Sequence, residues 1–110
     1  MRISINKNTE LSNKYLRFLK WKIYQLAEKF GDLIYVEVFL NSEGQSPKIY
    51  VANIRLGIAG KDIILKDRSR NLWVLFQRLH RKAQQNLARQ NQLNKKRRVD
   101  FSRQIYQETL

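Results

Sequence analysis

The residues best suited to chemistry lie in one long stretch, residues 68–98. It contains ten Lys or Arg residues and no Asp or Glu. Four of the cations recur at i, i+3, i+4 and i+11, which aligns them along about 16 Å of one helix face; they are Arg78, Arg81, Lys82 and Arg89. Exposed helix faces usually mix both signs of charge. A purely cationic row, with no acid within reach, indicates a surface that follows successive phosphates of a polyanion. The spacing does not distinguish rRNA, tRNA and DNA.

The same stretch carries an apolar stripe at helical spacing. The stripe falls within one broad sector at 100° per residue and comprises Leu72, Leu75, Phe76, Leu79, Ala83 and Leu87. We therefore expect an amphipathic helix over residues 69–92, with Ser69 as its N-cap.

The whole composition agrees with a basic, globular domain. A chain of 110 residues with 43% hydrophobic content fits one domain. Its net charge is +13. Residues 1–67 hold eleven Lys/Arg against seven acids, and residues 68–110 hold eleven against two. Binding of such a chain to phosphates should be steeply salt-dependent.

Signals of catalysis are weak. The nine acids are scattered singly, cysteine is absent, and the glycines form no phosphate-binding spacing. The one histidine, His80, lies at the border of the apolar face without a partner acid nearby in the sequence. We expect no enzyme activity, no metal and no cofactor. The N-terminus has no apolar signal core and no segment is a membrane span, so a soluble, cytoplasmic protein is expected.

An earlier helix is expected over residues 12–30. Its core face holds Leu19, Ile23 and Leu26, and its opposite face mixes cations with aromatics: Lys14, Arg17, Lys20, Trp21 and Tyr24. Trp21 and Tyr24 are candidates for stacking on bases. They could equally pack under neighbouring lysine stems, and the pattern leaves both interpretations open.

The remaining segments predict four strands. Alternating or β-branched residues mark 2–6, 33–40, 48–56 and 61–66, and the short links predict that the last three form an antiparallel meander. The order is β-α-β-β-β-α. We expect an α+β fold in which two amphipathic helices pack on one face of a four-stranded sheet, with the other face open to solvent. Residues 1–94 would form this domain and residues 95–110 a basic, flexible tail.

In its predicted order of strands and helices and in three local sequence patterns, the chain resembles the ribosome hibernation-promoting factors. This family is also known as the ribosome-associated inhibitor or sigma-54 modulation protein family. The patterns are ELSNKYLRFLKWKIYQLAEKF, LIYVEVFL and GKDIILKDRSRNLWVLFQRLHRKAQQNLAR. Lys22 and Lys82 fall at basic positions of the family, and Trp73 at a tyrosine. Asn71, Gln85 and Gln25 replace an acid, an Arg and a Lys, whereas Arg78 and Arg81 stand where the family is usually not basic.

The resemblance implies a non-enzymatic translation inhibitor that occupies the mRNA and tRNA channel of the small ribosomal subunit. Phosphates of the rRNA would contact residues of both helices and the tail, namely Lys14, Arg17, Lys22, Arg78, Arg81, Lys82, Arg89, Lys95, Lys96 and Arg97. A short family form is expected, with a second factor as a candidate helper in ribosome dimerisation.

Two other functions stay open on the sequence. The α-β-β-β-α core is shared with double-stranded-RNA-binding modules, which would favour isolated duplexes over ribosomes. A small basic ribonuclease toxin, with His80 or a Tyr and Arg as catalytic groups, would cleave RNA.

Overall fold

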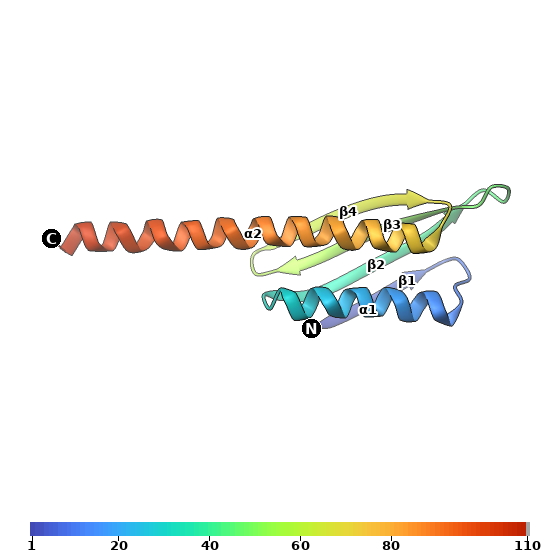
Figure 1. Ribbon diagram of the computed structural model, residues 1–110, viewed down its shortest axis with the longest axis horizontal. Helices are drawn as coiled ribbons and strands as arrows, with labels where there is room; N and C mark the ends of the chain where they lie inside the picture. The colour runs from blue at the N-terminus through green and yellow to red at the C-terminus, as the bar shows by residue number, and fades with distance from the viewer. Residues whose placement is uncertain (110) are drawn as a thin grey trace.

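The computed structural model describes the backbone of residues 1–109 and the side chains of residues 1–92. Its elements follow the predicted order (Figure 1): β1 Arg2–Lys7, α1 Asn13–Lys29, β2 Leu33–Glu43, β3 Ile49–Ile58, β4 Lys61–Ser69 and α2 Leu72–Thr109. Over the part of the chain that is described, neither helix is both long enough and apolar enough to cross a membrane.

The four strands form one mixed sheet in the order β1-β2-β3-β4. β1 pairs in parallel with β2, because α1 carries the chain back between them. β2, β3 and β4 pair antiparallel, which confirms the predicted meander. The β3–β4 link contains Gly60 at φ +76°, in the left-handed region that glycine adopts without strain.

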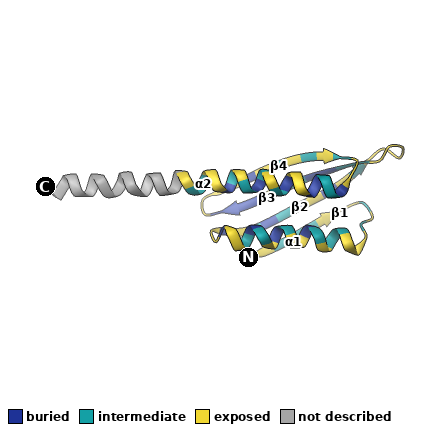
Figure 2. Cartoon of the chain, viewed as in Figure 1, coloured by how far each residue is buried: buried dark blue, intermediate teal, exposed yellow. Residues whose placement is uncertain are grey.

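The core lies between the sheet and the two helices, which cover the same face (Figures 1 and 2). Val36, Val38 and Leu40 alternate along β2 and are fully buried there. All six residues of the predicted α2 stripe are buried, as are Leu19, Ile23 and Leu26 of α1. The structure thus confirms the α+β fold with two helices on one face.

The start of α2 differs from the prediction. Residues 67–69 stay in β4, where Ser69 pairs with Tyr50 of β3, so the helix begins only at Leu72. The N-cap is Asn71 and not Ser69. The Oδ1 of Asn71 accepts hydrogen bonds from the backbone N–H groups of Trp73 at 2.9 Å and Val74 at 3.3 Å. Pairing in the sheet extended the strand beyond its apolar residues.

The end of α2 also differs, since the helix continues past Gln92 to Thr109. The division at residue 94 into a binding domain and a flexible tail stays a prediction. The side chains of Lys95, Lys96 and Arg97 lie outside the described residues.

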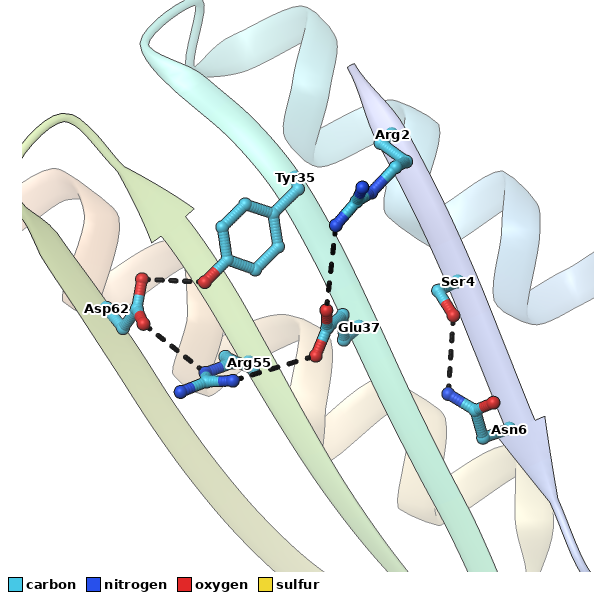
Figure 3. A network of polar contacts seen from close by, with 7 residues as sticks. All are labelled: Arg2, Ser4, Asn6, Tyr35, Glu37, Arg55 and Asp62. Atoms are coloured by element: carbon cyan, nitrogen blue, oxygen red, sulfur yellow. Dashed lines mark hydrogen bonds and ion pairs between the residues drawn. The ribbon is translucent and has the colours of Figure 1, made fainter.

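The open face of the sheet carries ion pairs that cross all four strands (Figure 3). Glu37 lies between Arg2, at 4.0 Å, and Arg55, at 3.9 Å. Arg55 also pairs with Asp62 at 3.3 Å, and the hydroxyl of Tyr35 donates to Asp62 over 2.7 Å. Exposed pairs contribute only about 0–1 kcal/mol each. Their main consequence is electrostatic, because acids offset the cations on this face.

Candidate nucleic-acid interface

The outer surfaces of both α1 and α2 carry exposed cations. Both helices begin at the same end of the molecule and run in the same direction over the sheet (Figure 1). We name this surface the helical face and define it by its exposed cations: Lys14, Arg17, Lys20 and Lys29 of α1, and Arg78, Arg81 and Arg89 of α2.

The helical face differs from the open face of the sheet in how its charges are balanced. Among the described residues, the ion pairs that involve Glu37, Glu43 and Asp62 all use arginines of the strands. Lys82 is the one helix cation that forms an ion pair within that part of the chain. The field of the helical face is therefore largely uncompensated, and an uncompensated field attracts polyanions.

Lys82 occupies a different environment from the other predicted phosphate contacts. Its ammonium lies 3.1 Å from a carboxylate oxygen of Asp67 and donates to the carbonyl of Lys66 over 3.3 Å. The expectation that no acid lies within reach of this basic row was wrong. Asp67 is distant along the sequence, but β4 runs beside α2 and places the carboxylate against the helix.

The charge state of Asp67 follows from these neighbours. Its burial by itself favours the neutral acid, but the backbone N–H of Arg68 and the ammonium of Lys82 stabilise the carboxylate, with a further contribution from Arg78. Together they hold the pKa of Asp67 below its ordinary value. Asp67 is thus a stable anion at neutral pH, and Lys82 ties α2 to β4.

Aromatic side chains join the two helices near their N-terminal ends. The ring centroid of Trp73 lies 4.6 Å from that of Tyr15 and 4.7 Å from that of Phe18. Such distances are typical of favourable tilted and edge-to-face pairs. The ammonium of Lys22 lies 5.5 Å from the Phe18 centroid and 5.3 Å from the Trp21 centroid. This cluster fixes the spacing of α1 from α2, and sequence reasoning did not find it.

The two candidate stacking residues have different neighbours. Trp21 is 54% exposed and lies next to Phe18, with its centroid 6.2 Å away, beneath Lys22. Tyr24 is 55% exposed and borders a groove between α1 and β1, together with Lys20. Trp21 packs under a lysine and also stays accessible, so base stacking by Trp21 stays a prediction.

His80 faces α1 from the third turn of α2. Its Nε2 is buried and has no hydrogen-bond partner among the described residues. Burial lowers the pKa of His80, and the nearby charges of Lys22 and Lys29 lower it further. The imidazole is therefore neutral at pH 7 and adds no charge to the helical face.

The fold is similar to that of two solved structures. One is a ribosomal subunit interface protein from Coxiella burnetii, with a TM-score of 0.72 and 11% identity over 83% of this chain and 98% of that chain. The other is the N-terminal domain of Protein Y from Thermus thermophilus, with a TM-score of 0.65 and 17% identity over 80% of this chain and 93% of that chain.

At these identities the matches establish a shared fold. No protein-family model matches the sequence, and no curated protein sequence is significantly similar to it. The fold that the resemblance to the ribosome hibernation-promoting factors implies is thereby confirmed.

Proposed function

We propose that this chain is a non-enzymatic ribosome-binding factor that inhibits translation, and that the helical face is its rRNA-binding surface. The observation that carries the proposal is the separation of charge between the two sides of the sheet. The cations of the helical face form no ion pair among the described residues, whereas arginines on the open face are paired with Glu37 and Asp62. The shared fold with a ribosomal subunit interface protein supports the choice of the ribosome as the polyanion.

Phosphate contacts would come from cations of both helices. Arg81 and Arg89 are exposed and lie along α2, and Arg17 is exposed on α1. Arginine presents a planar fork of donors that suits phosphate oxygens. Two helices side by side can therefore follow two phosphate strands at once. Lys82 contributes less, because binding a phosphate would compete with its contact to Asp67.

The place of binding would be the small-subunit channel used by mRNA and tRNA, as the family resemblance implies. A bound domain would exclude both ligands by occupying their space, and it needs no catalytic group to do so. This accounts for a chain with many arginines and no evident acid–base pair.

Co-sedimentation with small ribosomal subunits at low salt tests this function. The double variant Arg81→Glu, Arg89→Glu should abolish the association, because it replaces two phosphate donors with repelling carboxylates. The matched control is Lys61→Glu, Lys66→Glu, which changes the net charge equally at two exposed residues of β4.

The control variant should still co-sediment with subunits. Equal loss of binding in both double variants would show that only total charge matters and would overturn the helical face as the binding surface. Tighter binding to an isolated RNA duplex than to subunits would instead favour a double-stranded-RNA-binding module. RNA cleavage products would show an enzyme.

A further inference from the structure

A pocket of about 410 Å³ opens where both helices begin, above the start of β3. It lies at one end of the helical face and not in the middle of the cationic row. Its walls come from α1, β3, the β4–α2 connection and the first turn of α2, and they comprise Tyr15, Tyr50, Arg70, Asn71, Leu72 and Trp73. Its volume is within the range of about 300–1,000 Å³ that is common for sites of small organic ligands.

Three of the six lining side chains are aromatic and come from three separate elements. Tyr15 and Tyr50 are partly buried against the core, and Trp73 is partly buried beside Tyr15 and Phe18. The three rings are therefore held in place and also line the pocket. Trp73 is fixed further by its ring contact with Tyr15, at 4.6 Å between centroids. Rigid aromatic walls of this kind accept another flat ring by stacking, and every nucleobase offers one.

The rim of the pocket is positively charged. Arg70 is exposed and forms no ion pair within the described residues, in contrast to Arg68, which pairs with Glu43 at 3.3 Å. The ammonium of Lys14 lies 5.3 Å from the Tyr15 centroid, and that of Lys48 lies 5.3 Å from the Tyr50 centroid. Cations therefore surround an aromatic interior, which is the arrangement that a nucleotide needs for its phosphate and its base.

We propose that this pocket receives one unstacked nucleobase of single-stranded RNA, with the adjoining phosphate on Arg70. The proposal rests on the proposed function and deepens it, because it adds recognition of an unpaired nucleotide to phosphate binding along the helices. A base within a duplex is covered by its neighbours on both sides and cannot enter the pocket. The pocket therefore selects loops, bulges or free strands of RNA.

The two tryptophans of the chain allow a direct test by fluorescence. In Trp21→Phe the remaining indole, Trp73, reports on the pocket, and in Trp73→Phe the remaining Trp21 reports on the helical face. A single-stranded oligouridylate should quench Trp73 in the first variant. An RNA duplex of equal charge should leave Trp73 unchanged.

A second variant tests the wall of the pocket. Tyr50→Leu in the Trp21→Phe background should weaken binding of the oligouridylate about tenfold, as expected for the loss of one stacking interaction. Phe39→Leu is the matched control, because it removes an exposed aromatic side chain from the opposite face of the same sheet. It should bind as tightly as its parent, and circular dichroism should show that both variants are folded.

Equal quenching of Trp73 by duplex and single strand, or unchanged affinity in Tyr50→Leu, would overturn the nucleobase pocket. Co-sedimentation of the same variants with small subunits separates this failure from failure of the proposed function. If the variants bind subunits but the oligouridylate does not quench Trp73, only the nucleobase pocket is contradicted. If the unmodified chain does not bind subunits, the proposed function itself is contradicted.

Discussion

The cationic residues of the two helices differ in how free their side chains are to bind a phosphate, although the sequence presents them as equivalent. Lys82 is engaged by Asp67, Lys22 lies over two aromatic rings, and Arg81 projects into solvent. These differences come from neighbours on other elements. A variant at Arg81 should therefore affect RNA binding alone, whereas one at Lys82 should also loosen the contact between α2 and β4.

His80 makes the stability of the domain depend on pH. Because its folded-state pKa is lowered, the unfolded chain takes up a proton near pH 6.5 that the folded chain does not accept. The free energy of unfolding should thus be constant above that pH and should fall as the pH drops toward the folded-state pKa. His80→Gln should lose this dependence.

Urea unfolding at pH 7.5 and at pH 5.5 measures the effect of His80. Asp67 does not interfere, because its lowered pKa confines its own contribution to more acidic solutions. An identical change in unfolding free energy for the parent and His80→Gln would contradict the assignment.

At the scale of elements, the first turn of α2 decides the position of the helical face and of the pocket. The Asn71 side chain caps two backbone N–H groups there, directly beside Leu72 and Trp73. The start of α1 is different, since its N-cap Ser12 makes no side-chain hydrogen bond to the helix. The two helices therefore depend unequally on their caps.

This difference gives a paired prediction. Asn71→Ala should lower the free energy of unfolding by about 1 kcal/mol, the usual cost of removing an N-cap. Ser12→Ala should change it by less than about 0.5 kcal/mol, as is usual for a surface substitution. Chemical denaturation of both variants at pH 7.5 checks this, and equal losses would mean that the Asn71 hydrogen bonds contribute nothing specific.

At the scale of the whole molecule, charge is separated between two layers. The helical layer is cationic, and the open face of the sheet is interlaced with ion pairs (Figure 3). Such a molecule should approach a polyanion with its helices first, because the field is strongest there. The orientation of binding then follows from electrostatics before any specific contact forms.

The salt dependence of RNA binding should reveal this orientation. Removing one cation that binds a phosphate lowers the slope of log affinity against log salt concentration by about 0.7–0.9. Arg81→Gln should therefore reduce the slope by roughly that amount, whereas Lys61→Gln should leave it unchanged. Titrations of an rRNA fragment with each variant at several salt concentrations would measure the two slopes. Equal slopes for both variants would contradict the helical face as the binding surface.

Much of the fold follows from local patterns in the sequence. The stripes from Leu72 to Leu87 and from Leu19 to Leu26 repeat every three or four residues, and the meander has short links. These patterns predicted the order of elements and the buried faces. The boundaries of α2 were missed, because strand pairing at Ser69 and capping by Asn71 depend on contacts that periodicity does not encode.

The sequence by itself determined how much positive charge the chain carries, on which side of each helix that charge lies, and which apolar residues are buried. Only the tertiary structure decided which side chains meet. Asp67 reaches Lys82, and Tyr15, Tyr50 and Trp73 line one pocket, because packing on the sheet joins segments far apart in the chain. Helical and strand periods fix angles within one element, whereas the distances between elements are set by the core they share.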